Sequence, residues 1–167
     1  MFETERLRIR QFRITDVSRM AGFLNDKEVV KYTERIPHPY EYKDAREFVK
    51  KAQDEFGKVK YNYAIELKEE GIVGGIGVGK LFRKRGELGY WLGRPHWGKG
   101  IMTEAVKLLL RSQSKDFNLL VSRVSVENIG SQRVLEKCRF KRVGIIPNEH
   151  RNVFGEVTDT FQYYWQH

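Results

Sequence analysis

Residues 87–105 have the sequence ELGYWLGRPHWGKGIMTEA, which predicts three consecutive structural elements. The apolar and aromatic residues of 87–92 favour a strand. Glycine and proline within 93–100 indicate a loop. Apolar residues at helical spacing continue from about residue 101 to 115 and predict a helix. This stretch therefore joins a strand to a helix through a glycine-containing loop.

A junction of this kind is suited to bind an anion. The first N–H groups of a helix have no partner within the helix, and the helix dipole favours negative charge beside them. Gly98 and Gly100 allow the backbone to approach a phosphate without a Cβ clash, and Arg94 and Lys99 add positive charge. The sequence favours a pyrophosphate-binding loop here, and an ordinary tight turn between strand and helix is the alternative.

The rest of the chain predicts an α+β fold. The periodicity predicts strands at 6–12, 60–67, 72–82, 87–92, 119–126, 141–146 and 157–165, and helices after Thr15 or Asp16, at about 45–56, at 101–115 and at 131–137. The three central strands are expected to form an antiparallel meander. We therefore expect one domain over residues 1–167, with a mixed, mostly antiparallel sheet of about six to seven strands and about four helices.

The composition narrows the class of protein. The chain has 167 residues and a formal net charge of +9, which indicates an anionic partner such as nucleic acid, a membrane surface or a phosphorylated ligand. A single cysteine, Cys138, excludes an intramolecular disulfide and a cysteine-rich zinc site. No apolar run approaches the ~18 residues of a membrane-spanning helix, and the charged first residues do not resemble a signal peptide. We expect a cytoplasmic protein with no metal and no membrane partner.

Residues 74–80, with the sequence GGIGVGK, match part of the phosphate-binding loop of nucleoside triphosphatases. That motif needs Ser or Thr next, to hold magnesium, and a helix directly after it. Leu81 follows instead, and the chain continues into a charged turn and another strand. The segment is therefore interpreted as a glycine-rich strand that another backbone or a ligand approaches closely.

Several motifs in one order resemble the GNAT superfamily of acetyl-CoA-dependent N-acetyltransferases. Within it the chain is most similar to the RimJ/RimL type, which acetylates N-terminal amines of ribosomal proteins. The motifs are ERLRIR at 5–10, GYWL at 89–92, WGKG at 97–100, TEA at 103–105, Asn128 followed by Ser131, VLEK at 134–137 and Phe140. The resemblance covers nearly the whole chain and implies a GNAT fold with acetyl-CoA as the cofactor.

The resemblance also assigns residues to acetyl-CoA. It implies that the glycine loop holds the pyrophosphate, that Asn128 bonds the pantetheine arm and that Ser131 lies near the thioester sulfur. Capping of the following helix is the alternative for Asn128. The implied cofactor-binding residues are Leu92, Gly93, Arg94, Trp97, Gly98, Lys99, Gly100, Ile101, Met102, Thr103, Asn128, Ser131 and Arg133.

The implied reaction is direct attack of a neutral amine on the thioester in a ternary complex. A backbone N–H near Leu92 would stabilise the oxyanion. An amine with a pKa of ~8 arrives mostly protonated, so a base is needed. Glu87, at the start of its strand, is one candidate, and an ion pair with the basic turn at 83–85 is its alternative. Glu149, in the loop after the sixth strand, is the second candidate.

The leaving thiolate needs a proton. Leu135 stands where many GNAT enzymes carry a tyrosine acid, so Ser131 or water would supply this proton. His150 is expected to be a solvated loop residue. Arg139 stands where the family commonly has glycine at a helix end, a position that often takes a left-handed conformation.

The acceptor amine is the least constrained part of the prediction. A protein N-terminal α-amine, with a ribosomal protein as the substrate, is the first hypothesis, and a small amine such as a polyamine or an antibiotic is the second. A basic RNA- or ribosome-binding module without catalysis is a remote third, and a homodimer stays open. The acceptor site is expected in the loops at 26–42 and 147–156, lined by Tyr32, Tyr40, Tyr42 and Phe154.

Overall fold

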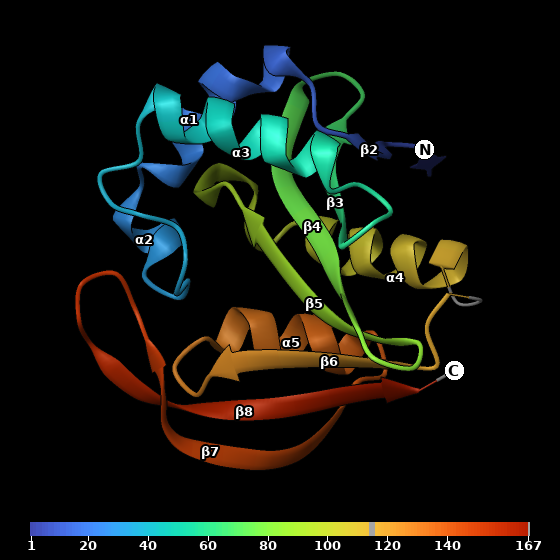
Figure 1. Ribbon diagram of the computed structural model, residues 1–167, viewed down its shortest axis with the longest axis vertical. Helices are drawn as coiled ribbons and strands as arrows, with labels where there is room; N and C mark the ends of the chain where they lie inside the picture. The colour runs from blue at the N-terminus through green and yellow to red at the C-terminus, as the bar shows by residue number, and fades with distance from the viewer. Residues whose placement is uncertain (114–115, 167) are drawn as a thin grey trace.

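The computed structural model describes residues 1–113 and 116–166. Its strands are β1 (Phe2–Glu3), β2 (Leu7–Gln11), β3 (Lys60–Leu67), β4 (Gly71–Leu81), β5 (Arg85–Leu92), β6 (Leu119–Ser125), β7 (Lys141–Arg151) and β8 (Val157–Gln166). Its α-helices are α1 (Val17–Leu24), α2 (Lys27–Val30), α3 (Tyr42–Asp54), α4 (Ile101–Gln113) and α5 (Ile129–Lys137). All eight strands form one sheet in the order β1-β2-β3-β4-β5-β6-β8-β7 (Figure 1). No helix in these ranges is long and apolar enough to span a membrane.

The predicted α+β class and mixed sheet are confirmed, with one strand and one helix more than the periodicity indicated. The added strand is β1, which pairs with β2 through Phe2 and Ile9. The added helix is α2, a single turn that the Asp26 side chain caps by accepting from the Glu28 N–H. Elements this short carry too few residues for a periodicity to be recognised. Residues 114 and 115, at the predicted end of the third helix, lie outside the described ranges.

The predicted end of the penultimate strand at residue 146 is wrong. β7 continues to Arg151 after a register irregularity between Ile146 and His150. Such irregularities break the polar–apolar alternation from which a strand is predicted. Glu149 and His150 therefore lie on a strand beside β8, and not in a loop.

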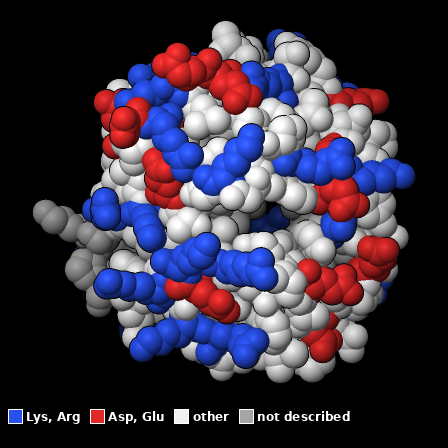
Figure 2. Space-filling model, turned by 180° about the vertical axis from the view of Figure 1, so that it is seen from behind, with Lys and Arg blue, Asp and Glu red and all other residues white. Residues whose placement is uncertain are grey.

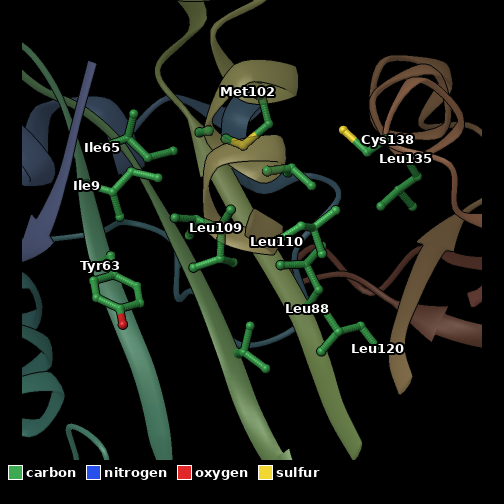
Figure 3. Packing of buried hydrophobic residues seen from close by; sticks show 14 of the residues in the cluster. Ile9, Tyr63, Ile65, Leu88, Met102, Leu109, Leu110, Leu120, Leu135 and Cys138 are labelled. Atoms are coloured by element: carbon green, nitrogen blue, oxygen red, sulfur yellow. The ribbon is translucent and has the colours of Figure 1, made fainter. Parts of the chain in front are cut away.

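Helices cover both faces of the sheet. On one face, α1 and α3 bury Met20 and Val49 against Ala64 of β3. On the other face, α4 and α5 bury Leu109 and Leu135 in the cluster that contains Ile65 (Figure 3). Ala64 and Ile65 belong to different clusters because successive strand residues point to opposite faces. The two clusters hold the central strands between two layers of helices.

β5 and β6 separate toward their C-terminal ends. They are the only two strands of the described residues that pair in parallel, and their pairing stops at Glu87 and Val121. One residue further along each strand, the Ser122 hydroxyl donates to the Leu88 carbonyl oxygen at 3.1 Å. Beyond it the two strands diverge (Figure 1). The result is an open wedge in the middle of the sheet.

The glycine-rich strand interpretation of residues 74–80 is confirmed, because they lie in β4. A Cβ at Gly74 would lie 2.6 Å from the Trp91 carbonyl oxygen, and one at Gly75 would lie 2.5 Å from the Trp91 indole nitrogen. Neither position leaves room for a side chain. The glycines therefore allow β5 and the Trp91 ring to lie close against β4, beside the wedge.

Candidate active site

Two cavities meet in the wedge between β5 and β6. The larger has a volume of about 610 Å³ and extends from the glycine loop to the first turns of α4 and α5. The smaller, of about 370 Å³, lies between the loop after α2, the centre of the sheet and the end of β7. Residues that line both cavities mark the place where they join: Tyr32, Thr33, Tyr90, Trp91, Asn128 and Ser131.

The larger cavity includes the predicted anion site. Gly98 and Gly100 both have φ of 73°, a left-handed conformation that glycine adopts without strain. Glu104 is the first residue of this turn whose N–H bonds back along the helix, to the Gly100 carbonyl oxygen at 3.0 Å. The N–H groups of 101–103 precede it, and these residues line the cavity. A Cβ at Gly98 would meet no heavy atom within 4 Å, so the loop has open space for a phosphate group.

Arg6 holds the glycine loop in place. Its guanidinium donates to the Lys99 carbonyl oxygen at 3.1 Å and to the Glu104 carboxylate at 2.8 Å. The Thr4 hydroxyl donates to the same carboxylate at 2.6 Å. The beginning of the chain and the first turn of α4 are therefore fastened together. Sequence reasoning assigned no role to Arg6, because its partners lie more than ninety residues away.

The remaining predicted cofactor residues divide into two groups. Leu92, Trp97, Asn128, Ser131 and Arg133 line the larger cavity with the glycine loop.

Gly93, Arg94 and Lys99 are not among its lining residues. A Cβ at Gly93 would lie 2.6 Å from the Phe23 ring, so this glycine serves packing against α1. Arg94 forms an ion pair with Asp26 at 2.7 Å, which ties the loop after β5 to the start of α2.

The end of β5 presents backbone groups to the wedge. The Gly93 N–H donates to the Val73 carbonyl oxygen at 2.9 Å, so the alternation of a strand directs the N–H and C=O of Leu92 away from β4. The Trp97 indole donates to the Leu92 carbonyl oxygen at 2.7 Å. The Leu92 N–H thus faces the wedge, as the predicted oxyanion role requires.

Tyr90 and Ser131 form the junction of the two cavities. Their hydroxyl oxygens lie 2.7 Å apart, and the Tyr90 hydroxyl also donates to the Ser131 carbonyl oxygen at 3.2 Å. Burial raises the pKa of Tyr90, so its hydroxyl stays protonated. The Asn128 side chain accepts from the Ser131 N–H at 3.0 Å and caps α5. Sequence reasoning missed Tyr90, although the absence of a tyrosine at Leu135 was a signal to look for another hydroxyl.

The two predicted base candidates share one arginine. Arg123 of β6 donates to Glu87 Oε1 from Nη2 at 2.6 Å and from Nε at 3.1 Å, and to Glu149 from Nη1 at 3.2 Å. These hydrogen bonds, first those to Glu87, raise the pKa of Arg123. The expected alternative partner of Glu87, the turn at 83–85, is therefore replaced by Arg123 on the neighbouring strand. Glu87 and Arg123 line the smaller cavity, and Glu149 is not among its lining residues.

The two loops predicted to form the acceptor site contact each other. The Asn152 side chain donates to the Lys31 carbonyl oxygen at 3.1 Å, and the rings of His38 and Phe154 lie 5.3 Å apart. Of the four aromatic residues expected there, Tyr32 and Tyr40 line the smaller cavity.

Tyr42 and Phe154 are not lining residues of that cavity. Tyr42 is exposed at the start of α3, and Phe154 is exposed in the turn between β7 and β8. Both lie in the segments expected to form the acceptor site, and the expectation that they line it is wrong.

His150 was expected to be solvated, and this is wrong. It lies on β7 with 6% of its surface exposed, and it lines the smaller cavity. Its Nδ1 lies 3.3 Å from Glu34 Oε1, and its buried Nε2 has no hydrogen-bond partner. The extension of β7 past residue 146 explains the difference.

Positive charge accompanies the larger cavity. Figure 2 shows a hollow on the face opposite to the view of Figure 1, with Lys and Arg side chains on both sides of it. Lys31, Arg133 and Lys137 line the larger cavity together with Glu28 and Glu127, and Lys31 is paired with Glu28 at 2.6 Å. Basic side chains combined with a helix N-terminus favour a polyphosphate ligand.

Comparison with known proteins agrees with this geometry. A family profile described as "Acetyltransferase (GNAT) domain" matches residues 6–141. The chain is 29% identical over 166 residues to the uncharacterized N-acetyltransferase p20 of Bacillus licheniformis, covering 96% of this chain and 92% of that protein. The crystal structure of a GNAT-family acetyltransferase from Bacillus anthracis superposes with a TM-score of 0.87 at 27% identity, covering 99% of this chain and 97% of that one.

Two further solved structures share the fold at lower identity. RimL, a ribosomal L7/L12 alpha-N-protein acetyltransferase in complex with coenzyme A, has a TM-score of 0.88 at 19% identity, covering 98% of this chain and 95% of that one. Spermidine N-acetyltransferase from Vibrio cholerae, in complex with CoA and spermine, has a TM-score of 0.82 at 18% identity, covering 98% and 96%. With the family match, these findings show that the chain belongs to the GNAT acetyltransferases, acyltransferases whose acetyl donor is acetyl-CoA.

Proposed function

We propose that this N-acetyltransferase transfers the acetyl group to the N-terminal α-amine of a protein, bound in the smaller cavity. The observation that carries the proposal is the junction of the two cavities at Tyr90, Asn128 and Ser131. One cavity ends at a helix N-terminus suited to polyphosphate, and the other contains carboxylates suited to an ammonium group. Two substrates held in these cavities would meet at the junction in reacting geometry.

On the donor side, the bound thioester supplies the acetyl group. The first turn of α4, with Gly98 and Gly100, would bind the pyrophosphate, and Asn128 would orient the pantetheine arm. The Leu92 N–H would donate to the thioester carbonyl oxygen, where negative charge develops. Ser131 would donate a proton to the leaving sulfur. These roles follow the placement of the residues around the wedge.

On the acceptor side, Glu87 and Glu149 would act together through Arg123. Each carboxylate accepts from the guanidinium, so the three side chains hold one another at the edge of the cavity. Glu87 is the carboxylate of this group that reaches the cavity, and it would attract the ammonium form of the acceptor. To act as the base itself, Glu87 would have to accept a proton while Arg123 donates to it.

The charge of the smaller cavity favours an acceptor with one positive charge. Its lining includes the carboxylates of Glu34 and Glu87, and also the basic side chains of Arg35, Lys60 and Arg123. A protein N-terminus brings one ammonium group, whereas a polyamine brings several and would face these basic residues. A small amine remains the second candidate, because the acidic residues would also bind an amine with a single charge.

The fold likeness to RimL supports a ribosomal protein as the acceptor. Since ribosomal proteins are made in the cytoplasm, the same proposal places the enzyme there. We propose that residues 1–167 act as one acetyltransferase domain. The single sheet that runs from Phe2 to Gln166 supports this, because its edge strands come from both ends of the chain.

An acceptor panel tests the proposal. The purified protein would be incubated with acetyl-CoA and with peptides that differ in their first residue, with the same peptides blocked at the N-terminus, with spermidine and with an aminoglycoside. Release of the free thiol measures the rate. We expect turnover with at least one free peptide, none with its blocked form and little with spermidine. Turnover with spermidine or the aminoglycoside alone would contradict the protein acceptor and favour the small amine.

A further inference from the structure

His150 is placed to interact with an acceptor amine. Among the described residues it is the only histidine that lines the smaller cavity. With 6% of its surface exposed, it is more than nine-tenths buried. Its Nε2 is also buried and has no hydrogen-bond partner in the structure. A buried nitrogen without a partner, on a side chain that lines a cavity, indicates that a ligand supplies the missing partner.

Glu34 determines which imidazole nitrogen carries the proton. Its carboxylate oxygen lies 3.3 Å from His150 Nδ1. A carboxylate accepts hydrogen bonds, so it favours the neutral tautomer with the proton on Nδ1 and a lone pair on Nε2. The unpartnered nitrogen is therefore the one that can accept a proton.

A chain of contacts connects His150 with the cavity junction. His150 pairs with Thr158 in the register of β7 and β8. The Thr158 hydroxyl lies 2.9 Å from the hydroxyl of Ser125, at the end of β6. The Ser125 carbonyl oxygen accepts from the Asn128 N–H at 3.0 Å, and Asn128 caps the helix that carries Ser131. His150, in the lining of the smaller cavity, is thus connected to the junction through β8 and β6.

His150 differs from Glu87, the carboxylate of the Arg123 group that lines the same cavity, in the hydrogen bonds that it already makes. Glu87 Oε1 already accepts two N–H groups of Arg123, whereas His150 Nε2 has no partner in the structure. Histidine is also the side chain whose ordinary pKa lies nearest to neutral pH, where a general base is most effective.

We propose that His150 is the catalytic base that removes a proton from the acceptor ammonium, and that Glu34 is its positioning residue. The inference rests on the proposed function, amine acetylation at this site. One proton moves from the ammonium nitrogen to Nε2. The freed lone pair forms the N–C bond while the C–S bond breaks. A second proton leaves the amine nitrogen and neutralises the leaving thiolate, with Ser131 or water passing it on. The imidazolium then releases its proton to solvent.

Other charged groups face the same cavity and enter any pH dependence. They are Glu34 and Arg35 from the loop after α2, Lys60 from β3, Glu87 from β5 and Arg123 from β6, together with the phenols of Tyr32, Tyr40 and Tyr90. The tests must therefore distinguish the effect of His150 on the pH dependence from the effect of Glu87.

The tautomer can be measured without turnover. Nitrogen-15 NMR of the imidazoles in the full chain, assigned with His150→Gln, should show neutral His150 with its proton on Nδ1. Glu34→Gln should weaken that preference. A wild-type signal with the proton on Nε2 would overturn the proposal, because the lone pair would then face Glu34.

The kinetic test uses the peptide that the wild type acetylates fastest. His150→Gln should lower kcat about 100-fold near pH 7. The deficit should shrink at about pH 9.5, above the α-amine pKa of ~8, because the amine then loses its proton to solvent. The KM for acetyl-CoA should change by less than about 2-fold. Glu34→Gln should produce the same pH-dependent deficit at a smaller size, and it tests the proposal even if His150→Gln folds poorly.

A control variant and the contrary results complete the test. The control is His38→Gln. His38 packs against Phe154 near the smaller cavity but does not line it, so this variant should leave the dependence of kcat on pH unchanged. A pH-dependent deficit in Glu87→Gln but not in His150→Gln would make Glu87 the base. An equal deficit at every pH in His150→Gln would show a structural role and overturn the proposal. If the wild type acetylates no amine while it binds acetyl-CoA, the proposed function itself fails.

Discussion

The hydroxyl of Tyr90 lies 2.7 Å from the hydroxyl of Ser131, at the place where the two cavities join. Tyr90 comes from the part of β5 that has separated from β6, and Ser131 comes from the first turn of α5. Because burial raises the pKa of Tyr90, its hydroxyl remains a donor. Its single proton can go to the Ser131 carbonyl oxygen or to Ser131 Oγ, and when it goes to Oγ the serine proton is left free to point toward a leaving thiolate. Tyr90 thus orients the hydroxyl that the proposed mechanism uses.

Tyr90→Phe removes this orientation and keeps the ring. We expect kcat to fall about 10-fold, with the KM for acetyl-CoA nearly unchanged, because the lost hydrogen bond acts mainly on the leaving group. The free energy of unfolding should fall by about 1 kcal/mol. Tyr163→Phe is the matched control, since that hydroxyl is bonded to Glu136 and lines neither cavity. Steady-state kinetics that change equally in both variants would remove Tyr90 from the mechanism.

Gly98→Ala tests the glycine loop. The φ of 73° makes any L-residue strained by about 1–2 kcal/mol, and the added methyl would point into the space proposed for the pyrophosphate. Calorimetric titration should therefore show at least about 10-fold weaker binding of coenzyme A. Gly71→Ala carries the same type of strain at φ 94°, at the first residue of β4, and Gly71 lines neither cavity. It should lose similar stability and bind coenzyme A normally, and weaker binding in both variants would contradict the assignment.

His96 makes stability depend on pH. Burial is the main cause that lowers its pKa in the folded protein. The unfolded chain therefore binds the proton more readily, and stability must decrease as the pH falls through the ordinary value of ~6.5. The slope for one proton is at most about 1.4 kcal/mol per pH unit. Urea unfolding between about pH 8 and pH 6 should show this decrease in the wild type and a smaller one in His96→Gln. Equal decreases in both would assign the effect to other groups.

The strand–loop–helix core of the site could be predicted because its signals are local. Residues 87–105 contain their own periodicity, turn residues and helix start, and β5, the glycine loop and α4 lie where these signals indicate. Arginine in place of glycine at position 139 put the geometry of this helix end in doubt, and the structure keeps the left-handed conformation there. The φ of Arg139 is 67°, although the side chain is arginine, because the Arg139 and Phe140 N–H groups bond back to Glu136 and Leu135 at the helix end.

The partners of the acceptor side could not be predicted, because they come from distant segments. Arg123 of β6 reaches Glu87 on the neighbouring strand β5, and it reaches Glu149 of β7 across β8. Neither separation along the chain produces a periodic signal in the sequence. His150 was misplaced for a related reason. The irregular register before it hides the strand in the sequence, so its burial against Glu34 appears only when the sheet is assembled.

The central claim is that donor and acceptor occupy two joined cavities and meet at Tyr90 and Ser131. A bisubstrate analogue tests it most directly: coenzyme A joined through an acetyl linker to the N-terminus of the best peptide acceptor. If both cavities are filled through their junction, the analogue should bind about 100-fold or more tightly than coenzyme A, and Ser131→Trp should remove the gain by closing the junction. Binding no tighter than coenzyme A alone, or a gain that survives Ser131→Trp, would contradict the claim.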